Sequence, residues 1–219
     1  MTDTARCPRC HTDLGIRLDG ALCPACLLRL AMDVPDDEPD DDVEPPFETI
    51  TLLADSPSGP TFLAVPIGTT RRVALKLARH AAAGITRRFD RWRRVLVFER
   101  YSGLARVVDA GPALDGCVYI ADEYTAGASL ATLLGQHRLD MRARRAVFDH
   151  ALASVAALHL KGVAHMRLSI DRIRVVQTDP VQITIVGLGR ALLLDDVEPN
   201  PAMDFAALDQ LSADLGVSR

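Results

Sequence analysis

The stretch RRVALKLA, residues 71–78, decides the fold class of this chain. It follows a Gly-Thr-Thr turn signal, and two similar short runs precede it, FETITLLAD at 47–55 and TFLAVPI at 61–67. Serine, proline and glycine separate those two runs. Short apolar runs bounded by turn residues predict strands. The sequence therefore predicts three strands, the first of which begins near Phe47.

The next segments predict a helix and two more strands. Residues 86–101 are the helix candidate, and LARVVDAG at 104–111 and CVYIADEY at 117–124 are the strand candidates. Five strands with one helix inserted after the third predict an antiparallel sheet with that helix beside it.

Helices are predicted to dominate the remainder. Residues 141–161 carry apolar side chains at helical spacing and stop at Gly162, a good C-terminal signal. Two short strands at 173–177 and 182–187 follow as a hairpin, and a helix at 202–214 comes last. The predicted fold class is therefore α+β.

Composition narrows the function classes. The 219 residues are 48% hydrophobic and 25% charged, as in an ordinary globular protein. A net charge of −4 gives no overall basic field, so nucleic acid is not an expected partner. No apolar run is long enough to span a membrane and no signal peptide is recognisable, so we expect a cytoplasmic protein without membrane contact.

Two C-x-x-C pairs predict a zinc ribbon over residues 1–33. Cys7 and Cys10 form one pair, and Cys23 and Cys26 form the other. Four thiolates at this spacing hold one structural zinc ion tetrahedrally and leave no position open for water. The alternative is a pair of redox-active or disulfide-forming motifs.

Residues 34–46 predict a linker. Like charges with interspersed prolines, as in VPDDEPDDDVEPP, cannot bury apolar surface. A weak, salt-sensitive contact between this acidic run and the arginines of helix 86–101 is one expectation. The alternative is that the two charged segments ignore each other.

Four motifs carry a resemblance to a known family. VALKL at 73–77 matches the V-A-I-K strand of protein kinases, and DEYTAGASLATLL at 122–134 looks like their hinge and following helix. AHMRLSIDRIRVV at 164–176 aligns with the catalytic loop, and ITIVGLGRALLL at 183–194 falls where D-F-G belongs. The chain thus resembles bacterial serine/threonine kinases of the eukaryotic type, some of which also begin with a cysteine ribbon.

The resemblance implies a two-lobed kinase-like domain over residues 47–219, after the ribbon and linker. The strand lobe would cover about 47–122, and a truncated helical lobe would cover about 123–219. Asp204 aligns with the helix aspartate that braces the catalytic loop, and His165 is expected to pack and hydrogen-bond within that loop. An ordinary aspartate near a helix N-terminus is the alternative for Asp204.

Most residues that the family uses for phosphoryl transfer are replaced. The replacements are DSPSGPTF for the glycine-rich loop, Trp92 for the helix glutamate that pairs with Lys76, Arg167 for the base, Arg172 for the metal-binding Asn, and Gly187-Leu188-Gly189 for D-F-G. An arginine neither accepts a proton nor binds magnesium. The expectation is a catalytically inactive pseudokinase that is not an enzyme, uses neither ATP nor magnesium, and acts as a regulatory protein-binding scaffold.

Two other functions stay open. In the first, Lys76, Arg167 and Arg172 converge and bind a nucleotide or another phosphate-bearing ligand without magnesium, because arginine suits that geometry. In the second, the chain is an unusual transferase, although no replacement base is evident. Lys76 has the alternative of being a solvated strand residue.

The end of the helical lobe predicts a contact surface. Helix 202–214 carries apolar residues on more than one side, and we expect a protein partner or a second copy of the chain to cover them. The alternative is that this helix packs wholly on helix 141–161.

Overall fold

The computed structural model describes residues 45–79, 87–113, 117–194 and 198–218. All of them fall within one compact unit that runs from Asp41 to Arg219. The predicted zinc ribbon, its four cysteines and nearly all of the predicted linker lie outside the described residues, as does the predicted contact of the acidic run.

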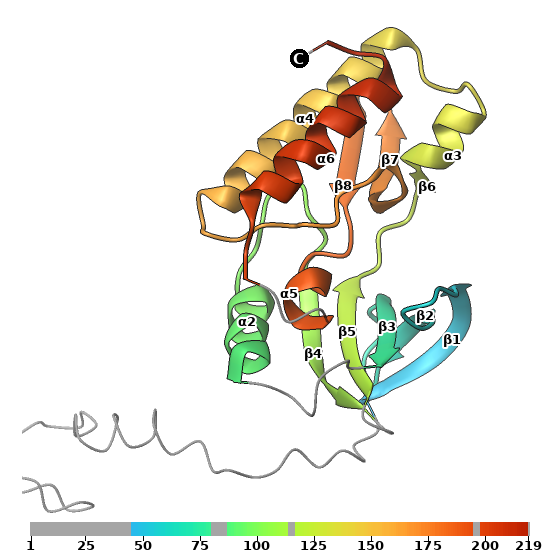
Figure 1. Ribbon diagram of the computed structural model, residues 1–219. Coiled ribbons are helices and arrows are strands. Elements are labelled where there is room, and N and C mark those ends of the chain that lie inside the picture. The colour runs from blue at the N-terminus through green and yellow to red at the C-terminus, as the bar shows by residue number, and fades with distance from the viewer. Residues whose placement is uncertain (1–44, 80–86, 114–116, 195–197, 219) are drawn as a thin grey trace, which may run out of the picture. The chain divides into compact units, whose positions relative to one another are not determined.

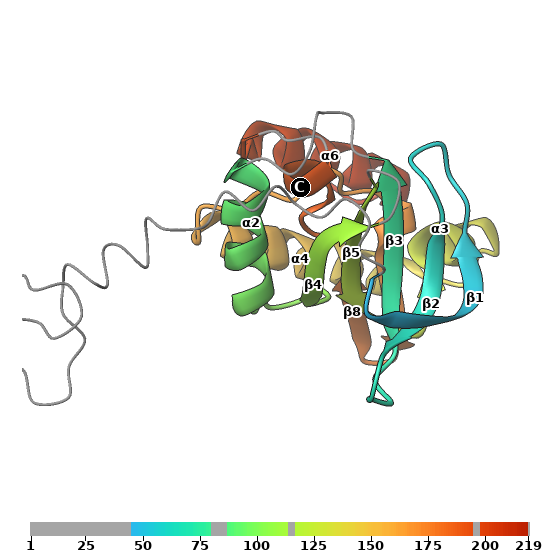
Figure 2. The same ribbon diagram turned by 90° about the horizontal axis from the view of Figure 1, so that it is seen from below.

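A five-stranded antiparallel sheet forms the first lobe. Its order is β1-β2-β3-β5-β4, so β1 is one edge and β4 the other (Figure 2). The strands are β1 (Phe47–Ala54), β2 (Thr61–Pro66), β3 (Val73–Arg79), β4 (Val107–Ala113) and β5 (Cys117–Glu123). All five predicted strands are therefore present, with bounds that shift by one to three residues.

The helix predicted after the third strand is also present, as α2 (Arg87–Phe98). It lies beside β4 and α5 (Arg190–Leu194) (Figures 1 and 2). Phe89, Trp92 and Leu96 recur at three- and four-residue spacing and are buried in one core cluster with residues of β3, β4 and β5. The apolar side of α2 thus covers one face of the sheet.

The second lobe is mainly helical. Its first helix is α3 (Leu130–Gly135), which Ser129 caps by accepting from the backbone N–H of Thr132. Asp140 caps α4 (Met141–His159) in the same way. A small sheet packs beneath them, formed by β6 (Ala128–Ser129), β7 (Ile173–Thr178) and β8 (Val181–Ile185). The turn η1 (Ile170–Arg172) precedes β7.

Backbone contacts join the connection between α2 and β4 in the first lobe to β8 in the second. Leu104 forms a parallel bridge with Ile185, and the N–H of Ala105 donates to the carbonyl of Ile185 at 2.8 Å. The core cluster around α2 also includes Leu158 and Met166 of the second lobe. Backbone hydrogen bonds therefore hold β8 against the first lobe, and the core cluster around α2 holds the segment around Met166 against it.

The last helix, α6 (Pro201–Leu215), packs along α4 (Figure 1). It buries Leu208, Leu211 and Leu215, while Met203 and Phe205 stay half exposed. The expectation that a partner or a second copy covers this helix stays a prediction. Within the described ranges, no helix combines the length and the apolar character needed to cross a membrane.

Candidate functional site

Lys76 is the first member of the candidate site, and it is not solvated. It lies opposite Ile120 in the pairing of β3 with β5, and only 1% of its surface is exposed. Its Nζ donates to the Ser56 hydroxyl at 3.0 Å and to the carbonyl oxygen of Gly59. The β1–β2 turn, residues 55–60, therefore closes over the ammonium group.

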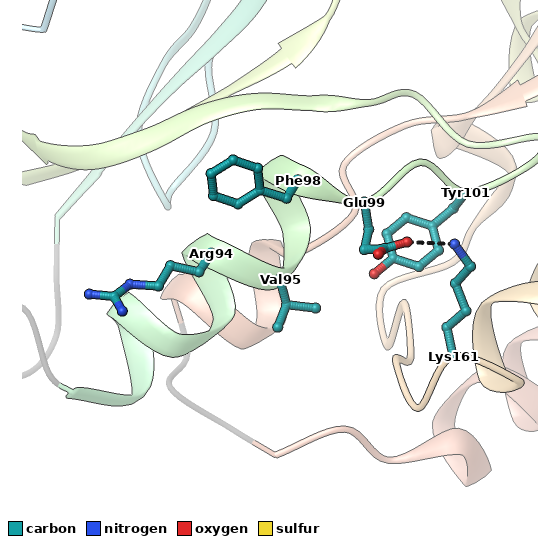
Figure 3. Close-up of a pocket in the computed structure, with 6 residues that line it drawn as sticks. All are labelled: Arg94, Val95, Phe98, Glu99, Tyr101 and Lys161. Atoms are coloured by element: carbon teal, nitrogen blue, oxygen red, sulfur yellow. Dashed lines mark hydrogen bonds and ion pairs between the residues drawn. The ribbon is translucent and has the colours of Figure 1, made fainter. Parts of the chain in front are cut away.

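Trp92, which aligns with the helix glutamate of kinases, lies on α2 as expected and is buried in the core. Glu99, which follows α2, pairs with Lys161 rather than with Lys76, at 2.6 Å between Oε2 and Nζ. Figure 3 shows this pair next to Tyr101. These three residues line a pocket of about 600 Å³ together with Arg94, Val95 and Phe98. The hydrogen bonds of Lys76 therefore go to a turn, and Glu99 serves a different surface.

Arg172 fills the space next to Gly187. The backbone of Gly187 has φ +84°, and a Cβ built there would collide with Nη1 of Arg172 and lie 3.2 Å from Nε of Arg190. A side chain at position 187 is therefore incompatible with the present position of Arg172. The replacements at 172 and 187 are therefore neighbours in the structure, and the guanidinium group of Arg172 occupies the place of a side chain at 187.

Arg190 and Asp122 join the site, although the sequence analysis singled out neither. Nη2 of Arg190 lies 3.9 Å from Oδ2 of Asp122, whose carboxyl is buried and also receives the backbone N–H of Gly187. Oδ1 of Asp122 has no hydrogen-bond partner among the described residues. A charged residue inside the apolar strand CVYIADEY was the signal that could have identified Asp122.

We call Lys76, Arg167, Arg172 and Arg190 the cation cluster. Burial, together with Arg190, Arg172 and Arg167 and against the opposing charge of Asp55, lowers the pKa of Lys76 to about 8. Burial, Arg190 and Arg167 also lower the pKa of Arg172 to about 10. The charges of Arg167 and Arg172 thus act on the pKa of Lys76, and that of Arg167 acts on the pKa of Arg172.

Asp122 gives a pH-dependent expectation. Burial raises its pKa from 3.8 to about 6, against the attraction of Arg190 and Arg172. A raised carboxyl pKa contributes stability that is complete below the unfolded value and is lost as the pH rises through the folded value. Between about pH 4.5 and 7.5 this loss is about 2 kcal/mol, at about 1.4 kcal/mol per pKa unit.

The Asp122→Asn variant should lack this loss, because its amide does not titrate. Urea unfolding at both pH values measures it: the difference in stability between variant and parent should favour the variant more at the higher pH. Asp149→Asn, which removes an exposed carboxyl of α4, is the control. An Asp122→Asn difference that does not change with pH contradicts the expectation.

His165 packs and hydrogen-bonds as expected. It is 1% exposed, its Nδ1 accepts from the N–H of Arg167 at 3.3 Å, and its Nε2 lies 3.3 Å from the carbonyl oxygen of Val186. These partners fit a neutral ring with the proton on Nε2. Burial lowers the pKa of His165 to about 4, which agrees with the neutral form.

The bracing role predicted for Asp204 is confirmed. This fully buried carboxylate accepts the backbone N–H groups of His165 at 2.8 Å and Met166 at 2.6 Å. His159 of α4 lies 2.8 Å from the same carboxylate. Met166 has φ +58°, a strained value for this residue type, so Asp204 holds the catalytic-loop segment in a conformation that it would not adopt alone.

Comparison with solved structures identifies this arrangement of lobes. The kinase domain of PknI from Mycobacterium tuberculosis superposes with a TM-score of 0.64 at 19% identity, over 79% of this chain and 75% of that one. Rad53 residues 1–466 superpose with a TM-score of 0.60 at 20% identity, over 78% of this chain and 46% of that one. The chain has the protein-kinase fold.

Sequence comparison agrees. The serine/threonine-protein kinase pkn3 of Myxococcus xanthus is 27% identical over 163 residues, or 72% of this chain and 30% of the relative. The serine/threonine-protein kinase pkn2 of the same organism is 26% identical over 174 residues, or 78% of this chain and 20% of the relative. The chain is thus homologous to bacterial serine/threonine kinases but spans less than a third of their length. No family model matches it.

These relatives overturn the expectation that the chain is not an enzyme. Both curated relatives are named serine/threonine-protein kinases, and the solved neighbours are kinase structures, which points to a kinase enzyme. The inference from missing motifs was wrong for a physical reason. Phosphoryl transfer depends mainly on positioning and electrostatic stabilisation, and cationic groups remain at the site in the buried Lys76 and the partly buried Arg172 and Arg190.

Proposed function

We propose that this chain is a regulatory module with the serine/threonine-kinase fold that binds a phosphate-bearing ligand at the cation cluster. A nucleotide is the simplest candidate, because the Rad53 structure with the same fold is a complex with AMP-PNP. The observation that carries the proposal is the convergence of Lys76, Arg172 and Arg190 around Gly187 and Asp122.

Charge and geometry support this ligand class. The guanidinium group presents a planar set of donors that matches phosphate oxygens, and it stays charged at all physiological pH values. Asp122 offsets part of the charge of the arginines, and the hydrogen bonds of Lys76 go to neutral oxygens. The surplus of positive charge can neutralise phosphate without magnesium.

Ligand binding requires an exchange at the β1–β2 turn. Ser56 and Gly59 now occupy the hydrogen-bonding positions of the Lys76 ammonium group, so a phosphate that reaches it must replace one of them. The Arg172 side of the cluster is partly exposed and can receive the ligand first. A ligand would thus bind weakly to Arg172 first, and would bind Lys76 as well only after the turn has moved.

Calorimetric titration with ATP in EDTA tests the proposal. Binding should occur without magnesium, and Lys76→Met and Arg172→Gln should each weaken it about tenfold or more, since a charge-assisted hydrogen bond contributes about 1.5 to 3 kcal/mol. Arg145→Gln, which removes an exposed arginine of α4, is the matched control. No binding, or equal binding by Arg172→Gln, contradicts the proposed site.

Transfer of labelled phosphate from ATP to the chain and to a basic protein substrate should be measured alongside, with magnesium present. The names of the relatives favour this activity, and its rate in the Lys76→Met variant indicates whether the same cluster serves it. The proposal also includes a structural zinc site at Cys7, Cys10, Cys23 and Cys26, which lie outside the described residues. It places the protein in the cytoplasm.

A further inference from the structure

The Ser56 hydroxyl combines exposure with contact to a buried cation. Ser56 lies in the exposed β1–β2 turn, yet its Oγ is 3.0 Å from Nζ of Lys76. The same oxygen is 3.0 Å from the carbonyl of Gly59, to which it donates, and 3.1 Å from Oγ of Ser58. A group attached to this oxygen would therefore start beside the ammonium group and remain open to solvent on its other side.

The surroundings of Lys76 lack negative charge. Both oxygens that accept its hydrogen bonds are neutral. Among the charges of the described residues that act on Lys76, three arginines oppose its protonation and Asp55 alone supports it. A dianion attached to Ser56 would correct this imbalance, because phosphate pairs strongly with ammonium and guanidinium groups.

We propose that Ser56 is a phosphorylation site whose phosphate is bound by Lys76 and the neighbouring arginines. A protein kinase transfers the γ-phosphoryl group of a nucleoside triphosphate: a bond forms between Oγ of Ser56 and the γ-phosphorus. The bond from that phosphorus to the bridging oxygen breaks, the nucleoside diphosphate leaves, and the hydroxyl proton passes to solvent. The product carries a charge of about −1.5 to −2 at neutral pH.

Phosphorylation of Ser56 also regulates the site of the proposed function, and this part rests on that function. A phosphate on the turn occupies the cations that a soluble phosphate ligand needs, and it does so at high local concentration. It removes the bond from the Ser56 hydroxyl to Gly59 but keeps the turn over Lys76. The modified chain should therefore exclude the ligand.

Phosphoserine incorporated at position 56 of the full chain by genetic encoding tests the binding of the phosphate, with phosphoserine at position 58 as the matched control. Ser58 lies in the same exposed turn, and its hydroxyl hydrogen-bonds the Ser56 hydroxyl rather than a cation. Phosphorus NMR titration should give a lower phosphate pKa at 56 than at 58. Adding Lys76→Met should remove most of the difference. Equal pKa values at the two positions overturn the proposal.

Two further measurements separate this proposal from the proposed function. Affinity for ATP in EDTA should fall about tenfold or more with phosphoserine at 56 and should change little with phosphoserine at 58. If the unmodified chain binds no ATP while the phosphate pKa at 56 is still lowered, the proposed function fails and the phosphate site stands.

Modification itself is tested by incubating the chain with ATP, magnesium and the kinase domain of PknI, a solved neighbour of this chain. Mass-spectrometric mapping should find phosphate on Ser56 in the parent and none on that peptide in Ser56→Ala. Phosphate on Ser58 alone, or on neither serine, overturns Ser56 as the acceptor.

Discussion

Replacing Asp204 with alanine is expected to lower the free energy of unfolding by about 3 to 5 kcal/mol, because two buried N–H groups lose their acceptor. The carboxylate is fully buried and accepts from His165 and Met166 at 2.8 and 2.6 Å. Without it, Met166 loses the hydrogen bond to its own backbone N–H, and side-chain packing is left to hold its strained φ. The catalytic-loop segment should then loosen before the rest of the domain.

Urea unfolding and hydrogen exchange measure the two parts of this prediction. Asp204→Asn should fall between parent and alanine variant, because its amide keeps one acceptor oxygen. Gln210→Ala removes an exposed side chain from the same helix and should change stability by less than about 0.5 kcal/mol. An Asp204→Ala variant as stable as Gln210→Ala would show that the hydrogen bonds of Asp204 do not contribute to the free energy of unfolding.

The strands and the first helix could be predicted because their signals are local. Turn residues bound the runs that become β1, β2 and β3, and the apolar spacing of Phe89, Trp92 and Leu96 sets one face of α2. The short elements α5, β6 and η1 have no periodic signal of their own. Contacts with the rest of the fold determine them, so the sequence alone did not indicate them.

The candidate site was predicted in part. Lys76, Arg167 and Arg172 could be named by alignment to motifs, but alignment does not give exposure. The alternative of a solvated Lys76 was wrong because both faces of β3 are covered: Leu75 is buried on one face, and Lys76 shares the other with buried Ile120. Strand alternation predicts one polar face only where a sheet has one solvated side.

Positions that depart from the kinase motifs one by one in the sequence can touch one another in the folded chain. Positions 172 and 187 are in contact, so a side chain at 187 would displace the guanidinium group of Arg172 from its present position. Asp122 and Arg190 complete the same group, joining β5 to α5. The site therefore keeps charged groups in contact, with Asp122 as the carboxylate beside the arginines, and single-position comparison does not detect such contacts.

Replacing Gly59 with alanine is expected to destabilise the domain by about 3 kcal/mol and to uncover Lys76. Gly59 has φ +109°, which residues with a side chain rarely adopt, and a Cβ there would collide with the carbonyl oxygen of Leu77. The turn must move away from β3 to relieve the collision. The carbonyl oxygen of residue 59 then no longer reaches the Lys76 ammonium group.

The chain contains only two lysines, so acetylation by a soluble ester reports this opening directly. Mass spectrometry should show Lys76 reacting slowly in the parent and at least about tenfold faster in Gly59→Ala, since reaction then requires less local opening. Lys161, half exposed on the second lobe, is the internal reference in each sample and should keep its rate.

Gly68→Ala is the matched control for this effect, because Gly68 also has positive φ, at +79°, but a Cβ there meets nothing within 4 Å. It should cost about 1 to 2 kcal/mol, from the backbone conformation alone, and leave the reactivity of Lys76 unchanged. If both variants acetylate Lys76 at the parent rate, the contact with the turn does not protect the ammonium group. In that case a ligand would reach Lys76 without displacing Ser56 or Gly59.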